Sequence, residues 1–155
     1  MSSSTLNVMR LSLGKKGDYA VRATLCLALG TGTRLKAREI ASEMDIPEAY
    51  LPQVLATLIK AGLVGSVAGP DGGYYLARPP AEVSLLEVVE AAEGPLVGET
   101  CVLSGGPCNW NGACVLHEHW EEAQDALVAR LDQTTFADLC PTDRGTRTPV
   151  TGEAS

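Results

Sequence analysis

Apolar side chains recur at helical spacing in three successive segments of the first part of the chain. Residues 19–29 form an apolar-rich run that follows an aspartate and precedes a glycine, which are typical start and stop signals of a helix. Residues 35–44 predict a second, shorter helix. The third helix is expected to start near residues 48–49, because Pro52 is tolerated only in a first turn.

Two short apolar runs, residues 63–67 and 74–77, flank the glycine-rich segment Gly69-Pro70-Asp71-Gly72-Gly73. Short runs on either side of such a segment predict a β-hairpin. The order helix, turn, helix, hairpin is typical of a winged helix-turn-helix. We therefore predict a mainly α fold with a small β-hairpin wing, followed by a long dimerisation helix.

The second half of the chain begins after Pro79-Pro80. Ser84 and Glu87 form a capping-box pattern for a helix over residues 85–92, and residues 95–112 are read as a loop. A long helix is expected from about residue 114 to 131, with an apolar stripe made of Leu116, Trp120, Ala123, Leu127 and Leu131.

This pattern divides the chain into three parts. Residues 9–80 are expected to form the DNA-binding domain, residues 81–139 the cysteine loop and dimerisation helix, and residues 140–155 a disordered polar tail. The net charge of −7 is distributed in the same way, since residues 1–80 carry +3 and residues 81–155 carry −10. A basic first half suits contact with a polyanion, and the acidic second half would repel one.

Composition also excludes several classes of protein. No apolar run approaches the roughly 18 residues of a membrane span, and residues 1–16 lack the apolar stretch of a signal peptide, so a cytoplasmic protein is expected. The chain has two histidines and shows no signature of an activated nucleophile. Its glycine-rich segment joins strand to strand and not strand to helix, which argues against a nucleotide site. We expect no enzyme activity and no small-molecule substrate.

The loop of the second half carries the pattern Cys101-x6-Cys108-x5-Cys114-x2-His117. Clustered thiolates select zinc or an iron–sulfur cluster over hard cations. Zinc sites usually pair cysteines more closely, so the wide spacing favours an iron–sulfur cluster and leaves structural zinc as the alternative. Cys26 lies in an apolar helix and is expected to be a core residue, and Cys140 an incidental thiol.

Together these motifs resemble the IscR/NsrR-type winged-helix regulators of the Rrf family. The resemblance covers about residues 9–135 and is carried by the cysteine loop, by Trp120, and by Met9-Arg10-Leu11, Lys16-Gly17-Asp18-Tyr19-Ala20-Val21, Ile46-Pro47-Glu48-Ala49-Tyr50-Leu51-Pro52-Gln53, Lys60-Ala61-Gly62-Leu63-Val64, Gly69-Pro70-Asp71-Gly72-Gly73-Tyr74 and Leu76-Ala77-Arg78-Pro79.

The resemblance implies a homodimer that binds a near-palindromic operator in double-stranded DNA. It also implies a [2Fe–2S] or [4Fe–4S] cluster on the three cysteines, whose state alters DNA affinity. His117 matches a ligand of IscR and is the favoured fourth ligand. Asp18 matches the position that supplies an oxygen ligand from the partner subunit in an NsrR-type protein, although a carboxylate there also suits a helix N-terminus.

The chain departs from the family pattern at three places. The first cysteine gap has one extra residue, Asp71 stands in a wing loop that is often all glycine, and Ala68 replaces an arginine that reaches the minor groove in relatives. An arginine there gains from the negative potential of the groove, and alanine does not.

Within the third helix, Tyr50 and Gln53 are the candidate base-reading residues, since glutamine can contact adenine bidentately. The candidate phosphate contacts are Arg10, Lys15, Lys16, Arg34, Lys36, Arg38 and Lys60. We expect the protein to be a DNA-binding transcriptional regulator, and specifically a repressor, that senses redox state, nitric oxide or iron–sulfur supply. The alternatives are an iron–sulfur adaptor that binds a protein partner without DNA, and a zinc-stabilised repressor.

Overall fold

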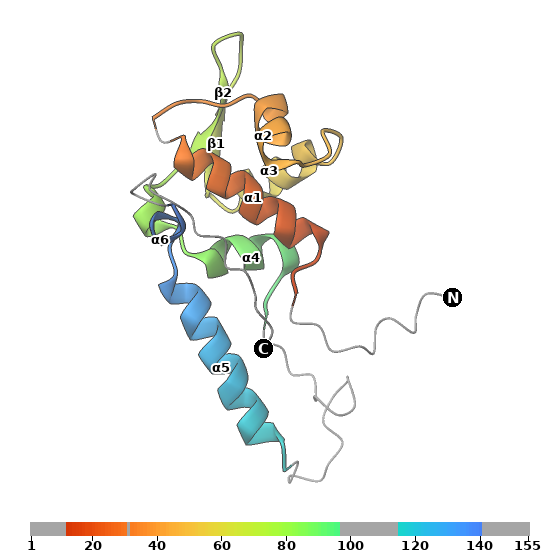
Figure 1. The fold of residues 1–155 in the computed structure, drawn as a ribbon, viewed down its shortest axis with the longest axis vertical. Coiled ribbons are helices and arrows are strands. Elements are labelled where there is room, and N and C mark those ends of the chain that lie inside the picture. Colours follow the sequence, from red (N-terminus) through yellow and green to blue (C-terminus); the bar gives the residue numbers. More distant parts are fainter. Residues whose placement is uncertain (1–11, 31, 97–114, 141–155) are drawn as a thin grey trace, which may run out of the picture.

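The computed structural model describes residues 12–30, 32–96 and 115–140. Its elements, in chain order, are α1 (Lys15–Leu29), α2 (Ala37–Met44), α3 (Leu51–Lys60), β1 (Val64–Val67), β2 (Gly73–Leu76), the short 3-10 helix η2 (Pro80–Glu82), α4 (Leu85–Glu93), α5 (His117–Gln133) and α6 (Phe136–Leu139) (Figure 1). The order of α1, α2, α3 and the β1–β2 hairpin confirms the predicted winged helix-turn-helix.

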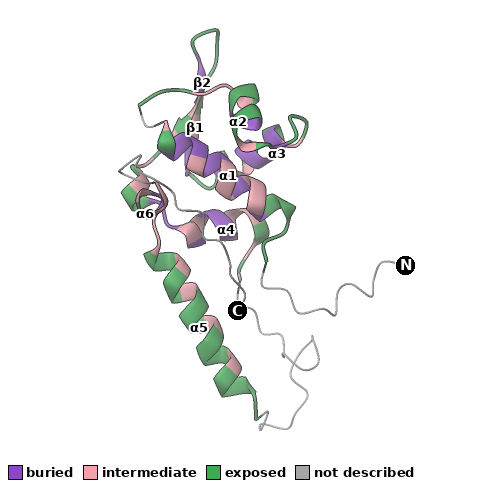
Figure 2. Ribbon diagram, in the orientation of Figure 1, coloured by how far each residue is buried: buried purple, intermediate pink, exposed green. Residues whose placement is uncertain are grey.

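The core lies around α1, which contacts α2, α3, α4, α6 and β2. Its buried side includes Ala20, Ala23 and Leu27, and the small alanines let the neighbouring helices approach closely. Helix α3 contributes Leu51 and Leu55, both 0% exposed. Figure 2 shows the buried residues concentrated in α1, α3 and α4, while α5 is exposed or intermediate along its length. The apolar face predicted for the third helix is therefore the face that packs into the core.

The start of α3 differs from the prediction. The helix begins at Leu51, and residues 48–50 form a turn in which the Tyr50 N–H donates to the Pro47 carbonyl over 2.9 Å. The expected start near residues 48–49 was too early. Pro52 still lies in the first turn, where its missing N–H has no helical partner to lose.

The wing is an antiparallel hairpin in which Val64 pairs with Leu76 and Val67 with Gly73. A Cβ on Gly65 would overlap the Tyr75 ring, so a larger residue at this position would have to displace that half-exposed side chain. Residues outside the hairpin also join it, because Leu35 forms an isolated bridge with Tyr74. The wing is thereby tied to the segment that leads into α2.

Helix α4 begins with the predicted capping box. The Ser84 hydroxyl accepts from the Glu87 N–H over 3.1 Å, and the Glu87 carboxylate accepts from the Ser84 N–H over 3.0 Å. Burial opposes ionisation of Glu87, but the bonds from Ser84 and Arg78 prevail and lower its pKa below the ordinary value. Gly94 ends α4 with a positive φ of 86°, a conformation that favours glycine.

Helix α5 extends away from the rest of the chain and buries none of its residues (Figure 1). Its apolar stripe includes Leu127, which is 47% exposed. The helix α6 that follows was not predicted, although Thr135 and Asp138 form a capping box that marks its start. No helix within the described ranges is long and apolar enough to cross a membrane.

Candidate nucleic-acid interface and cluster ligands

The helix-turn-helix, which we call the reading head, consists of α2, a tight turn and α3. Asp45 ends α2 in the left-handed conformation with φ of 54°, and the Ile46 N–H donates back to the Ala41 carbonyl over 3.0 Å. Ile46 is buried and holds the turn against the core. Since α3 buries its apolar face, Gln53 stands on the exposed face. This is the geometry that a recognition helix requires.

Tyr50 is only partly exposed, because its ring packs edge-on against the Tyr19 ring of α1 with centroids 5.2 Å apart. This contact connects the first turn of α1 to the start of α3. Tyr50 therefore helps to fix the recognition helix, and Gln53 is the more accessible of the two candidate reading residues.

The candidate phosphate contacts fall into two groups. Lys15, Lys16, Arg38 and Lys60 have exposed side chains. Lys36 instead directs its ammonium to the wing, where it donates to the carbonyls of Gly69 over 3.1 Å and Pro70 over 2.9 Å. Arg34 donates to the Asp71 carbonyl over 3.4 Å. Arg10 lies outside the described residues.

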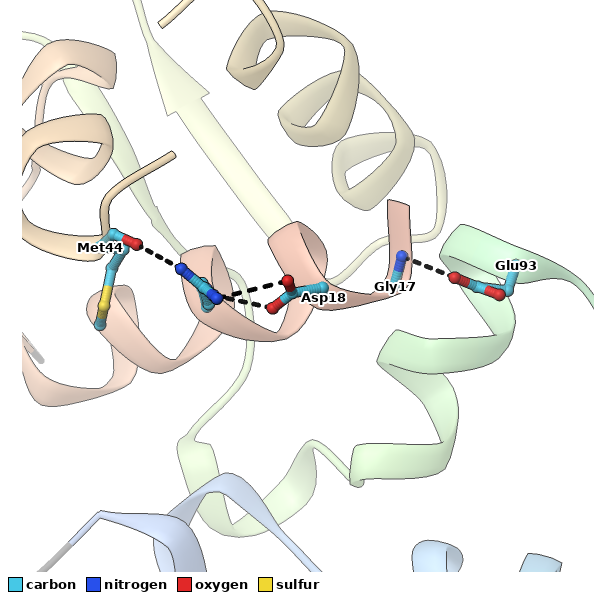
Figure 3. Close-up of polar contacts among 5 residues, drawn as sticks. Gly17, Asp18, Met44 and Glu93 are labelled. Atoms are coloured by element: carbon cyan, nitrogen blue, oxygen red, sulfur yellow. Dashed lines mark hydrogen bonds and ion pairs between the residues drawn. The ribbon is translucent and has the colours of Figure 1, made fainter. Parts of the chain in front are cut away.

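Asp18, the alternative fourth ligand, lies in the first turn of α1 with a side chain that is 43% exposed. Its carboxylate accepts from Arg22 Nε over 2.7 Å and from Arg22 NH2 over 3.3 Å. The remaining guanidinium nitrogen of Arg22 donates to the Met44 carbonyl over 3.1 Å. In Figure 3 the unlabelled side chain between Asp18 and Met44, the last residue of α2, is this arginine, and dashed lines mark its hydrogen bonds. The Asp18 carboxylate is thus two hydrogen bonds from the helix-turn-helix.

The first turn of α1 is also bound by α4. The Gly17 N–H donates to Glu93 Oε1 over 3.0 Å, and a carboxylate is stabilised beside the positive end of a helix (Figure 3). Gly14 supplies no side-chain cap, so Glu93 takes that role from another helix. A Cβ on Gly17 would lie 2.7 Å from this carboxylate oxygen, so a side chain at this position would displace Glu93 from its bond to α1. Glu93 is the last residue of α4. The segment that leads to the cysteine loop therefore begins beside the first turn of α1.

The three candidate cluster cysteines, Cys101, Cys108 and Cys114, lie outside the described residues. His117 is the first residue of α5, and its side chain is 63% exposed, with Nε2 3.6 Å from Glu121 Oε2. Within the described ranges, no group of three or more His, Cys, Asp or Glu side chains is placed to hold a metal ion. Asp18 lies in α1 and His117 begins α5, and Figure 1 shows α5 projecting away from α1.

The other two cysteines are partly or fully enclosed. Cys26 is 1% exposed, and its Sγ donates to Glu43 Oε2 over 3.4 Å. Burial, with the Glu43 carboxylate adding to it, raises the pKa of Cys26 to about 12, so this thiol stays protonated at neutral pH. Burial also raises the pKa of Cys140. Cys26 is the core residue that its position in an apolar run predicted.

Two residues of this region were absent from the sequence prediction. Arg22 was detectable, since its spacing of four from Asp18 is that of a helical ion pair. Glu93 was not detectable, because its partner Gly17 lies 76 residues away along the chain. His119, two residues after His117 on α5, is exposed.

Comparison with known proteins gives the chain a family. A family model described as an iron-dependent transcriptional regulator, Rrf2, matches residues 13–142. The chain is 34% identical over 130 residues to the HTH-type transcriptional regulator IscR of Enterobacter sp. strain 638, covering 83% of this chain and 79% of that protein. It is 33% identical over 130 residues to the IscR of Escherichia coli O1:K1, with 83% and 80% covered.

Solved structures agree with this match. The IscR of T. potens superposes with a TM-score of 0.68 at 32% identity, covering 83% of this chain and 85% of that one. CymR, the global cysteine regulator of B. subtilis, gives a TM-score of 0.72 at 30% identity, with 84% and 96% covered. These relatives are transcriptional regulators, which confirms the expectation that the chain is not an enzyme. The chain belongs to the Rrf2 family of DNA-binding, winged-helix transcriptional regulators.

Proposed function

We propose that this Rrf2-family protein is a cytoplasmic, homodimeric repressor whose affinity for its operator is set by an iron–sulfur cluster. The observation that carries the proposal is the position of the reading head relative to the cysteine segment. That segment begins after α4, whose last residue, Glu93, binds the first turn of α1. The same turn reaches the helix-turn-helix through Arg22. A short series of hydrogen bonds therefore connects the start of the cysteine segment with α2, and a structural change in that segment can reach α2 through it.

The proposed cluster ligands are Cys101, Cys108, Cys114 and His117, with Asp18 as the alternative fourth ligand. This donor set fits, because three thiolates select an iron–sulfur cluster or zinc, and one harder donor completes four positions. When bound, a [2Fe–2S] or [4Fe–4S] cluster supplies a centre that reacts with oxidants or nitric oxide. One non-thiolate ligand makes a single iron easier to release or attack, which suits a sensor.

For His117, the observation in favour is its neighbour. The Glu121 carboxylate lies 3.6 Å from His117 Nε2, one helical turn along α5. Histidines that bind metal usually donate their other ring N–H to such a carboxylate, which fixes the tautomer and orientation of the ring. The 3.6 Å separation is longer than a hydrogen bond, so Glu121 would take this role after a small side-chain movement.

For Asp18, the observation in favour is the bonded chain to Met44. A carboxylate drawn to an iron would weaken its bonds to Arg22, and Arg22 also holds the carbonyl at the end of α2. A ligand at this position would pass the state of the cluster directly to the reading head. With His117 as the ligand, the signal would pass through the cysteine loop and α5.

The dimer is supported by the exposure of α5. Within the described part of the chain no residue of α5 is buried, and Leu127 of its apolar stripe is 47% exposed, as expected of a face that a partner would cover. In the proposed arrangement residues 9–80 bind DNA, and residues 81–139 hold the cluster and the partner subunit. A symmetric dimer would read a near-palindromic site with half-sites about one helical turn, or a multiple of it, apart.

Anaerobic purification tests the cluster and the DNA together. We expect visible absorbance between about 400 and 460 nm, iron and sulfide in the protein, and a gel shift of its own promoter that changes when the cluster is removed. Cys108→Ser should lose the absorbance, and Cys26→Ser should keep it. Zinc without visible absorbance would establish the zinc-stabilised repressor instead. A cluster without any DNA binding would establish the adaptor.

Replacing Gln53 tests the reading helix. We expect Gln53→Ala to weaken binding to the operator by about 1–3 kcal/mol, roughly 5- to 150-fold, because a bidentate contact to adenine is lost. Binding to random-sequence DNA should change little, since phosphate contacts carry it. Anisotropy titrations at one salt concentration measure both. Gln133→Ala, at the exposed end of α5, is the matched control, and equal losses on both DNAs would contradict the assignment.

A further inference from the structure

The loop of the wing, residues 68–72, contains no basic side chain, and its one charged residue is Asp71. Its backbone is nevertheless bound by cations from another segment. The carbonyls of Gly69 and Pro70 accept from Lys36 Nζ over 3.1 and 2.9 Å, and the Asp71 carbonyl accepts from Arg34 over 3.4 Å. Three successive carbonyls of this wing loop therefore face two positive side chains.

The segment that carries these cations is fixed at both ends. Leu35, between them, exchanges two backbone hydrogen bonds with Tyr74 of β2, over 3.0 and 2.8 Å. Lys36 is the N-cap residue of α2, and its N–H donates to the Glu39 carboxylate over 2.6 Å. The Lys36 side chain thus spans from the first turn of the helix-turn-helix to the tip of the wing.

Of the two cations, Lys36 is bound more closely. Its distances of 2.9 and 3.1 Å are those of good N–H···O bonds, whereas 3.4 Å for Arg34 is at the long limit. An ammonium has three donors, so two bonds to the wing loop leave a third N–H for another acceptor. Carbonyl acceptors do not cancel a charge, and Lys36 therefore places a full positive charge beside the wing loop.

We propose that Lys36 is the residue through which the wing engages the DNA minor groove. It holds the wing loop at a fixed angle to α2 and supplies the positive charge that the loop itself lacks. A narrow minor groove, as in A-tracts, has enhanced negative potential and attracts such a charge. Lys36 is a positioning and specificity-determining residue of the wing, and Arg34 assists it. The inference rests on DNA binding by the protein.

The test compares two duplexes that share one central site and differ in their flanks. The site is the one that the wild-type protein selects from a random-sequence pool, flanked by A-tracts in one duplex and by G·C pairs in the other. We expect the wild-type protein to prefer A-tract flanks. Lys36→Met should bind the A-tract duplex about 5- to 10-fold more weakly and lose the flank preference, and its salt slope should fall by about one.

Three further variants separate the charge near the wing from a general loss of charge. Lys36→Arg should keep the flank preference. Lys36→Gln, which keeps an N–H donor without the charge, should lose it. Lys60→Met removes the same charge from the end of α3 and should reduce the salt slope by about one while it keeps the preference. Thermal unfolding of each variant shows that the fold is retained.

Each outcome has a distinct meaning. If selection with the wild-type protein recovers no site, the proposed function fails. If the wild-type protein binds a selected site without any flank preference, or if Lys36→Met retains the wild-type preference, the role of Lys36 is overturned. A weaker Lys36→Met with an intact flank preference would make Lys36 an ordinary phosphate contact and would also reject the inference.

Discussion

Replacing Phe136 with alanine is expected to lower the free energy of unfolding by about 3–5 kcal/mol. Phe136 is the first residue of α6, which contacts α1 and η2, and its side chain is 0% exposed in the hydrophobic core. Its N–H donates to the Val83 carbonyl over 3.0 Å, so the backbone around it is held in place and cannot easily collapse into the space left by the ring. The loss of unfolding free energy should therefore include most of the cost of the cavity that the missing ring leaves.

Urea unfolding of the cluster-free protein, at one fixed concentration, measures this loss. The concentration must be fixed because the proposed dimer would be stabilised by mass action. Phe136→Leu keeps most of the volume and should lose clearly less. Val115→Ala, at a position that is 72% exposed, is the surface control and should stay within about 0.5 kcal/mol of wild type. A loss below about 1 kcal/mol for Phe136→Ala would contradict the packing described here.

The backbone just before Phe136 also holds the end of α5. Thr134 and Thr135 lie between α5 and α6, and they pair with the start of α4 through the bridge from Thr135 to Ser84 and the 2.7 Å bond from the Leu85 N–H to the Thr134 carbonyl. Phe136 inserts immediately after this bridge. The direction in which α5 leaves the core is therefore set by this backbone pairing and by the contacts of α5 with α4, and the buried Phe136 ring anchors the segment that follows.

Phe136 belongs to a part of the fold that the sequence pattern did not predict. The helices α1 to α4 were predictable because each has a long apolar face or a capping signal, and the capping box of Ser84 and Glu87 marked the start of α4. Helix α6 has four residues, too few for periodicity to show. Its only local signal is the capping box at Thr135, and nothing local says that one phenylalanine enters a core built by residues far earlier in the chain.

The candidate site likewise contains features that local sequence spacing predicts and contacts that it does not predict. Local spacing predicted Gln53 on the exposed face of α3 and Cys26 in the core. It also nominated Lys36 as a phosphate contact, but the bonds from Lys36 to the wing loop span 33 and 34 residues and are set by the bridge between Leu35 and Tyr74. The bond from Gly17 to Glu93 is likewise created by the packing of α1 on α4. Contacts of this kind follow from the tertiary fold alone.

The second large effect is expected at the fourth ligand of the proposed cluster. His117→Ala should release iron at least about 10-fold faster to a chelator under anaerobic conditions, because changing even a residue that orients a ligand costs 10- to 100-fold in metal affinity. Glu121→Gln should act in the same direction and less strongly, since it retains an acceptor for His117 Nε2. Asp18→Ala should keep the cluster. Loss of visible absorbance gives the rates, and native mass spectrometry gives the cluster composition.

The opposite result would identify Asp18 as the ligand and make Arg22 the next residue to test. If Asp18→Ala loses the cluster and His117→Ala keeps it, Arg22→Met should retain the cluster but abolish the difference in operator affinity between cluster-loaded and cluster-free protein. The reason is that Arg22 alone joins the Asp18 carboxylate to the Met44 carbonyl in the described contacts. If neither Asp18→Ala nor His117→Ala changes the cluster, both assignments are wrong and the fourth ligand lies elsewhere.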